Sequence, residues 1–335
     1  MKPVIFGTTG LELSVDERAF FRDADPAGYI LFKRNCADRA QMRALTDSLR
    51  DLHGRDDLLI MIDQEGGRVA RMQPPEWPAF PNGAVFGELY EQAPISAIEA
   101  ARANAEAIGL ALSEVGVTVD ALPLLDVRQP GANDVIGDRA YGYEPMRVAA
   151  IGRAVLEGLQ AGGVTGIVKH MPGHGRVLVD SHKALPVVDA SEEELECDIA
   201  PFRQLNWAPI GMTAHIVYTA WDDARPGTLS HYVVQQIIRE RIGFDGLLMT
   251  DDIDMKALSG TPAEKACAAV EAGVDLVLDC WARMDEMVAI ADVLPDASDR
   301  TKERLAAALA FRKTPEPARF AELVAKRDEL LSLSL

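Results

Sequence analysis

Eight short apolar runs alternate with stretches of helical periodicity along this 335-residue chain. The runs are rich in Val, Ile and Leu and are bounded by glycine or polar residues, which is typical of strands buried on both faces. Strands that alternate with helices favour a parallel sheet with right-handed crossovers, and eight such units can close into a (β/α)8 TIM-like barrel. An open, doubly wound sheet is the alternative. The predicted strands span residues 4–7, 29–32, 58–63, 117–125, 166–170, 210–215, 247–251 and 274–278.

Helical periodicity fills the segments between these runs. Ser191 with Glu194 fits a capping box, and Thr261-Pro262 fits an N-cap followed by proline at the first helical position. There is no Ser/Gly-rich linker and no internal repeat, so we expect residues 1–335 to form a single catalytic domain. Residues 296–335 are expected to form C-terminal helices packed on the outside. The other predicted helices span residues 15–23, 38–53, 95–115, 145–161, 191–206, 230–242, 262–272 and 283–293.

Composition narrows the class of function. The formal net charge of −18 opposes binding to nucleic acids and anionic membranes, because phosphate recognition needs a basic face. No run of 18 apolar residues predicts a transmembrane helix, and the N-terminal ten residues lack the features of a signal peptide. The four cysteines stand far apart without a CxxC motif, as in cytosolic proteins. We therefore expect a cytoplasmic enzyme that acts on a small molecule, with no nucleic acid, membrane or protein partner.

Polar residues gather where the predicted strands end. A charged group at the end of a buried strand is costly unless it is solvated, paired or functional. In a closed parallel barrel all carboxyl ends meet at one rim, which is where such folds assemble their chemistry. The opposite ends of the strands show no similar concentration. The strand-end residues are Asp63, Asp126, Lys169, His170, His215 and Asp251.

Residues 63–71 combine two acids, a glycine pair and two arginines directly after the third strand. The glycines permit a tight turn. Asp63 can accept two hydroxyl hydrogen bonds from a sugar, and Arg71 can donate to another hydroxyl. A rim salt bridge beside a glycine turn is the structural alternative. Arg139, after the fourth strand, has the same two interpretations: a substrate clamp or a partner for the rim acids.

About twenty residues without periodicity follow Lys169-His170, and long loops of this kind are usually functional. Asp180 and His182 lie two positions apart there. A carboxylate beside an imidazole favours the charged form and fixes its tautomer, so His182 could protonate a leaving oxygen and later take a proton from water. A metal site made of His170, His174, His182 and Asp180 is the alternative.

Three acids within four residues, Asp251, Asp252 and Asp254, end the seventh strand. One carboxylate at this rim could attack an anomeric carbon and form a glycosyl-enzyme. A magnesium or calcium loop is the alternative, because hard cations prefer oxygen ligands. The spacing does not fit an EF-hand.

Taken together, these motifs resemble the bacterial glycoside hydrolase family 3 β-N-acetylhexosaminidases of the single-domain, cytoplasmic type. The matching segments occur in the order found in that family and span most of residues 1–260. Two departures are Met171, where the family usually has Phe, and Trp281, where it often has Asn. The matching segments are residues 30–35, 63–71, 135–139, 169–175 with 180–182, and 250–255.

The resemblance implies a role for individual residues. Asp251 matches the catalytic nucleophile, His182 the general acid/base and Asp180 its partner. It also implies no metal or organic cofactor, and a peptidoglycan-recycling substrate: N-acetylglucosamine β-1,4-linked to 1,6-anhydro-N-acetylmuramic acid, with or without a stem peptide. Residues that match those holding the terminal sugar are Asp63, Arg71, Arg139, Lys169 and His170.

The residues also admit other activities. A β-glucosidase or an N-acetylglucosamine phosphorylase would use the same fold, and a His acid/base suits phosphate as the nucleophile because a neutral imidazole repels an anion less than a carboxylate does. A metal-dependent hydrolase built on the His/Asp loop is the alternative from another class. A sugar-binding protein without turnover is the third.

Overall fold

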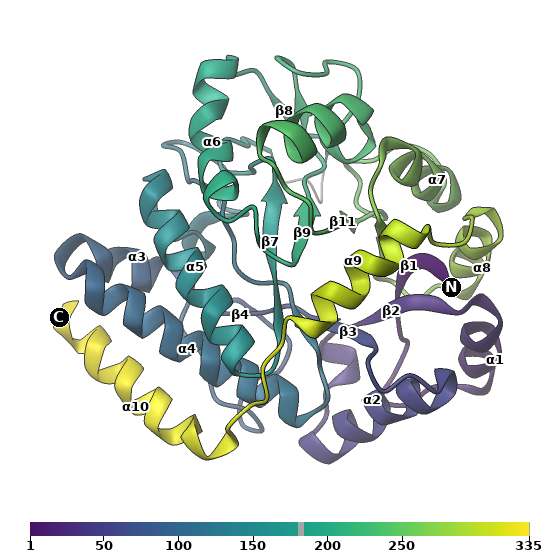
Figure 1. Ribbon diagram of the computed structural model, residues 1–335, viewed down its shortest axis with the longest axis horizontal. Helices are drawn as coiled ribbons and strands as arrows, with labels where there is room; N and C mark the ends of the chain where they lie inside the picture. The colour runs from purple at the N-terminus through teal and green to yellow at the C-terminus, as the bar shows by residue number, and fades with distance from the viewer. Residues whose placement is uncertain (180–183, 335) are drawn as a thin grey trace.

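The computed structural model describes residues 1–179 and 184–334. Within them, eight parallel strands close into a barrel in the order β1-β12-β11-β9-β7-β6-β3-β2, with helices around it (Figure 1). This confirms the predicted (β/α)8 fold and excludes the open sheet. The strands are β1 (Lys2–Gly7), β2 (Pro26–Leu31), β3 (Leu59–Ile62), β6 (Val119–Asp120), β7 (Thr165–Met171), β9 (Ile210–Thr213), β11 (Leu247–Asp252) and β12 (Leu276–Asp279).

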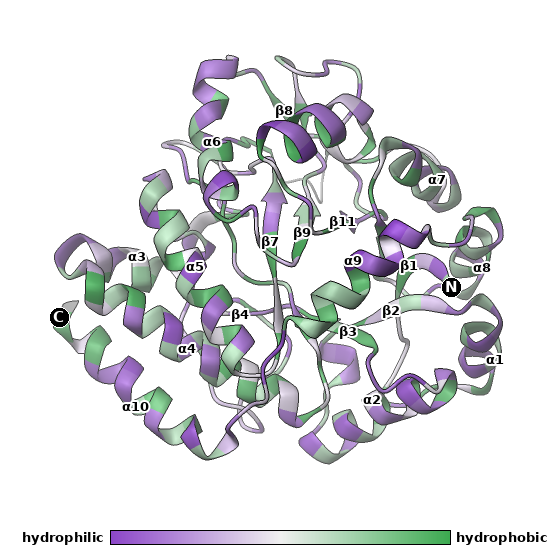
Figure 2. Ribbon diagram, viewed as in Figure 1, coloured by the Kyte–Doolittle hydropathy of each residue, from purple (hydrophilic) through white to green (hydrophobic). Residues whose placement is uncertain are grey.

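The predicted helices are present at the expected places. Both predicted caps form, since Ser191 accepts from the Glu194 N–H and Thr261 from the Glu264 N–H. Hydrophobic and hydrophilic bands alternate along outer helices such as α2, α4 and α10 (Figure 2). No helix in the described part of the chain is long and apolar enough to span a bilayer. The helices are α1 (Val15–Ala24), α2 (Arg39–His53), α4 (Pro94–Glu114), α5 (Pro145–Ala161), α6 (Glu192–Gln204), the π-helix η4 (Val233–Arg241), α7 (Pro262–Ala272) and α8 (Met284–Val293).

Side chains that alternate along the strands fill the barrel interior. Ile5, Met61, Ile167 and Met249 are among the fully buried residues of this inner cluster. The intervening residues face the helices and belong to a second, larger apolar cluster. Each strand is therefore buried on both faces, which is why it has a continuous apolar sequence.

The C-terminal segment does more than the predicted packing on the outside. Helix α10 (Phe320–Leu331) lies against α4, on the outer surface. Helix α9 (Asp299–Ala310) instead crosses the end of the barrel and lies in front of the strands in Figure 1. Its Leu305, Ala308 and Leu309 join the inner cluster, so α9 closes the end opposite the carboxyl ends of the strands. Spacing of three and four residues puts these side chains on one helical face.

Two features around the third and fourth strands were not predicted. Helix α3 (Gly83–Gln92) contains two glycines, which lowers its intrinsic helix propensity. The glycines are needed because a Cβ at Gly83 or Gly87 would stand 2.2 Å from the Arg139 or Tyr141 carbonyl oxygen. Tertiary packing therefore decides this helix. The fourth strand, predicted over 117–125, is reduced to Val119–Asp120, and Pro123 cannot donate to a ladder beyond it.

Two short pairs of strands, one antiparallel and one parallel, lie outside the barrel sheet. Strands β4 (Gln64–Gly66) and β5 (Val69–Ala70) form a hairpin directly after β3. Gly66 and Gly67 have φ of +97° and +56° there, which is the turn that the glycine pair predicted. Strand β8 (Val187–Val188) pairs with β10 (Val217–Tyr218).

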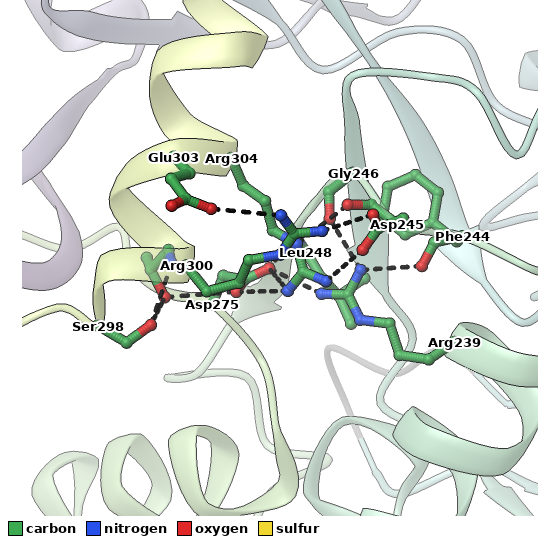
Figure 3. Close-up of polar contacts among 11 residues, drawn as sticks. Arg239, Phe244, Asp245, Gly246, Leu248, Asp275, Ser298, Arg300, Glu303 and Arg304 are labelled. Carbon is green, nitrogen blue, oxygen red and sulfur yellow. Dashed lines mark hydrogen bonds and ion pairs between the residues drawn. The ribbon is translucent and has the colours of Figure 1, made fainter.

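An ion-pair cluster fastens α9 to the barrel (Figure 3). Asp275 precedes β12 and is nearly buried. Its carboxylate accepts from Arg239 of η4 at 2.7 Å, from Arg304 of α9 at 3.0 Å and from the Leu248 N–H at 2.9 Å. One carboxylate thus joins a strand, the π-helix and the closing helix.

We expect Asp275→Ala to lower the free energy of unfolding by about 3 kcal/mol, because it leaves two partly buried guanidinium groups without their shared partner. Urea unfolding followed by circular dichroism measures this. The control is Glu303→Gln, which breaks only an exposed pair with Arg300. It should change stability by less than about 0.5 kcal/mol. Equal losses in both variants would contradict the assigned importance of Asp275.

Candidate active site

A cavity of about 640 Å³ opens at the carboxyl ends of the strands. Asp63, Lys169 and Asp251 line it, and each follows an inward-facing apolar residue by two positions. Since side chains alternate along a strand, all three project into the barrel axis above its apolar interior. The strands β3 and β11 stand four places apart in the ring, so Asp63 and Asp251 face each other across the cavity.

Glu65 lies at the centre of the cavity floor, which also includes Asp63, Arg139, Lys169 and His170. Its side chain is 4% exposed, and it accepts two hydrogen bonds from Arg139, at 2.7 and 2.8 Å. Lys169 Nζ lies 2.6 Å from Glu65 Oε1 and 3.8 Å from Asp63 Oδ1. Burial alone would raise the pKa of Glu65, but Arg139 and Lys169 outweigh it and hold the pKa well below its usual range. Glu65 therefore stays ionised and fixes both cations.

Asp63 is held from a second side by Arg71. Arg71 Nη2 donates to Asp63 Oδ2 at 2.8 Å, and its guanidinium lies 5.2 Å from the centre of the Phe32 ring. Asp63 thus has one oxygen directed to Arg71 and one near Lys169. A carboxylate and two cations in this arrangement can bind several neighbouring hydroxyl groups.

His170 is oriented by a buried carboxylate that sequence reasoning did not assign to the site. Asp126 Oδ2 lies 2.8 Å from His170 Nδ1, while Asp126 Oδ1 accepts from the backbone N–H groups of His170 and His174. Burial opposes ionisation of Asp126, but the two histidines outweigh it and lower its pKa. A carboxylate only accepts, so Nδ1 of His170 carries a proton. Asp126 therefore sets both the ring orientation and the tautomer.

His174 is buried beside His170, with ring centres 5.4 Å apart. Burial, reinforced by His170, lowers the pKa of His174 to about 4. This imidazole is therefore neutral at pH 7.

Asp251 is poised as an ionised carboxylate. Its Oδ1 accepts from the Asp252 N–H at 2.8 Å. Burial alone would raise the pKa of Asp251, but His170 and His215, with help from that N–H, lower it below the usual value. His215 is itself fixed between Thr228 Oγ1 at 2.8 Å and the Asp252 carbonyl oxygen at 2.9 Å. An ionised carboxylate facing a sugar-sized cavity can act as a nucleophile.

A group of acids lies beside Asp251 on β11 and β12. Burial, together with the charges of Asp251 and Asp254, raises the pKa of Asp252 to about 6. Asp279 is fully buried, and neither of its oxygens has a hydrogen-bond partner among the described residues. Burial, with Asp252 and Glu286, raises its pKa to about 7. These carboxyls therefore take up protons more readily than Asp251 does.

The structure brings together most of the residues predicted from the sequence. Asp180 and His182 lie outside the described residues, so their predicted roles stay predictions. Glu65, Asp126 and Trp281 were not predicted as site residues. Glu65 lies in the acid-glycine motif and Asp126 at a strand end, but only their contacts in the structure show what each residue does. The predicted residues that line the cavity are Asp63, Arg71, Arg139, Lys169, His170 and Asp251.

The part of the chain that the structure describes contains no complete set of ligands for the alternative metal site. No three His, Cys, Asp or Glu side chains are placed there to hold one ion. Two members of the suggested set, Asp180 and His182, lie beyond the described ranges. Cys280 also lines the cavity, and burial raises the pKa of its thiol well above the usual value.

Known proteins resemble this chain in sequence and structure. Residues 8–310 match the family model described as Glycosyl hydrolase family 3 N terminal domain. A protein of Methylococcus capsulatus named beta-hexosaminidase is 40% identical over 282 residues, which cover 82% of each chain. NagZ from Neisseria gonorrhoeae in complex with N-trifluoroacetyl-D-glucosamine superposes with a TM-score of 0.88 and 30% identity, over 100% of this chain and 98% of that one. The same protein in complex with zinc ion gives 0.86 and 29%, with the same coverage.

We expect Asp279→Asn to raise the free energy of unfolding above that of the parent protein at pH 8, and to do so by more than at pH 4. In the unfolded chain an aspartate titrates near about 3.9, so the folded protein binds more protons between there and pH 7 and loses stability as the pH rises. Asparagine cannot ionise, so the variant escapes this loss, which amounts to about 2–4 kcal/mol.

Urea unfolding of both proteins at pH 4 and pH 8 measures the effect. The comparison at pH 4 serves as the control, since the folded-state carboxyl is protonated there and the ionisation of an unfolded aspartate contributes only about 0.5 kcal/mol. A difference in unfolding free energy that is the same at both pH values would contradict the proposed titration of Asp279.

Proposed function

The chain belongs to glycosyl hydrolase family 3, and from this premise we propose that it is an exo-acting, retaining β-N-acetylglucosaminidase. The observation that carries the proposal is an ionised Asp251 facing a floor of paired charges in one cavity. The names of its relatives agree with an N-acetylhexosamine substrate, since one is a beta-hexosaminidase and another binds a glucosamine derivative.

The terminal sugar is held by the cavity floor. Asp63 accepts hydrogen bonds from hydroxyl groups, and Arg71, Lys169 and His170 donate to them. Arg139 donates two hydrogen bonds to Glu65, so its contribution is to keep Glu65 ionised and Lys169 in place. This is the second of the two predicted interpretations of Arg139, a partner for the rim acids, and its role in holding the sugar stays a prediction.

In the first chemical step, Asp251 Oδ2 forms a bond to the anomeric carbon while the bond from that carbon to the leaving oxygen breaks. His182 gives its proton to the leaving oxygen, and Asp180 stabilises the charged imidazole beforehand. The product is a covalent glycosyl-aspartate and a free aglycone. His170 and Lys169, both near Asp251, lower the energy of its carboxylate before attack.

In the second step, water attacks the anomeric carbon as His182 removes its proton, and the bond to Asp251 breaks. Two inversions leave the sugar with its original β configuration. Both catalytic groups return to their starting protonation states, so no cofactor is consumed.

We further propose that the natural substrates are muropeptide fragments in the cytoplasm. The sugar unit next to the terminal N-acetylglucosamine would be 1,6-anhydro-N-acetylmuramic acid, with or without its peptide. The acidic character of the chain fits small carbohydrate substrates rather than anionic polymers.

The test is hydrolysis of an aryl β-N-acetylglucosaminide against the matching aryl β-glucoside, in phosphate-free buffer containing EDTA. We expect the acetamido sugar to be preferred on the order of 100-fold. Asp251→Asn, which keeps the shape of the side chain, should lower kcat/KM at least about 10⁴-fold. Proton NMR should show the β-anomer as the first product.

Other outcomes would point elsewhere. Cleavage only after phosphate is added would indicate a phosphorylase. Cleavage only after Zn²⁺ or Mn²⁺ is added would favour the metal-dependent hydrolase. An α-anomer as the first product would contradict the two-step displacement.

His182→Ala should slow substrates with poor leaving groups far more than activated aryl glycosides. General acid catalysis is worth about 10²–10⁴-fold, and a leaving group that departs as a stable anion does not need it. The measurement compares kcat/KM for N,N′-diacetylchitobiose and a nitrophenyl glycoside. Asp180→Asn should change the ratio of the two kcat/KM values in the same direction as His182→Ala does. An equal loss on both substrates would count against the general-acid role.

A further inference from the structure

Trp281 presents an open indole ring at the mouth of the cavity. The side chain follows β12, lines the cavity and is 57% exposed. An aromatic ring that stays open beside a binding cavity offers an apolar face and a polar edge to a ligand. By comparison, Lys169 and His170 on the floor are 2% and 6% exposed.

The indole is held in place from both sides. Its Nε1 donates to Asp252 Oδ2 at 3.1 Å. The Arg283 guanidinium lies 5.9 Å from the ring centre, and Arg283 is in turn paired with Asp254 and with Glu286. A ring anchored at its edge and by a fixed cation loses little conformational entropy when a ligand binds to it.

The backbone next to Trp281 has an unusual conformation. Ala282 has φ of +57°, in the left-handed region that non-glycine residues rarely adopt. Such residues persist where the surrounding contacts hold them, and they concentrate at functional sites. Ala282 directly follows Trp281 and stands three positions beyond the end of β12, so this backbone conformation lies next to the tryptophan.

The position of Trp281 relative to the floor determines what it can contact. Strand β12 stands four places from β6 in the ring, so Trp281 lies across the cavity from the segment that carries Arg139. An exo-acting enzyme buries the terminal sugar at the floor, and the next unit must leave through the mouth. Trp281 is therefore one of the residues beside which the next unit can lie.

We propose that Trp281 is a specificity-determining residue on which the sugar adjacent to the terminal N-acetylglucosamine stacks. A pyranose presents a face of C–H groups, and this apolar face matches the open indole in shape and polarity. The assignment rests on the proposed function and adds to it a class of preferred aglycone, a pyranose ring rather than a small alkyl group.

The test is binding to Asp251→Asn protein, which keeps the cavity but does not turn over, measured by calorimetry. The two ligands are N,N′-diacetylchitobiose and methyl β-N-acetylglucosaminide, which share the terminal sugar and differ in the aglycone. We expect Trp281→Ala to weaken disaccharide binding about tenfold and to change binding of the methyl glycoside by less than about twofold.

Two variants separate stacking from other effects. Trp281→Phe keeps an aromatic face and loses the N–H, so it should retain most of the disaccharide affinity. Trp207→Ala is the matched control: Trp207 is 40% exposed but lies near Phe311, with ring centres 6.3 Å apart, and does not line the cavity. It should bind both ligands as the parent does.

Equal weakening of both ligands in Trp281→Ala would overturn the proposal and leave the glucosaminidase function intact. Unchanged binding of both ligands would overturn it in the same way. If the parent chain neither cleaves nor binds N-acetylglucosaminides, the proposed function and this inference fall together.

Discussion

The parallel closure of the barrel is the constraint from which the site follows. Eight strands that run in one direction must end on one rim, and alternation along each strand sends every second side chain inward. The inward positions are apolar through most of the barrel, and the last of them on three strands are Asp63, Lys169 and Asp251. The site therefore lies directly above the apolar interior of the barrel, at the carboxyl ends of the strands. The same closure leaves an opposite end that α9 must cover, and the Asp275 cluster secures it.

Charge pairing makes this layer possible. Taking ions out of water is expensive, and the cost is met only when each ion has close partners. Glu65 supplies those partners for Arg139 and Lys169, and Asp126 does the same for His170. The result is a floor whose charges are fixed before a ligand arrives, which is the condition for electrostatic catalysis without reorganisation. Asp251 stays ionised because His170, His215 and a backbone N–H favour its charged form.

The acids beside Asp251 on β11 and β12 differ from those of the floor. Asp252 and Asp279 have raised pKa values because burial and neighbouring acids oppose their ionisation. Their ionisation lowers the stability of the folded protein at high pH. One of them, Asp252, accepts the hydrogen bond from the Trp281 indole. The molecule thus separates a floor of satisfied ion pairs from a mouth with an open aromatic face.

The amino-acid sequence by itself determined the number and direction of the strands, the helical caps at Ser191 and Thr261, and the family, because these depend on local periodicity and short motifs. It also determined that Asp63, Lys169 and Asp251 share a rim, since strand ends in a parallel barrel meet. Only the tertiary structure decided the partners of Glu65 and Asp126, because those contacts join residues 74 and 44 positions apart. It likewise decided that the glycines of α3 pack against the segment carrying Arg139, and that α9 covers the barrel end. Such choices depend on which surfaces meet in space, and no local pattern encodes them.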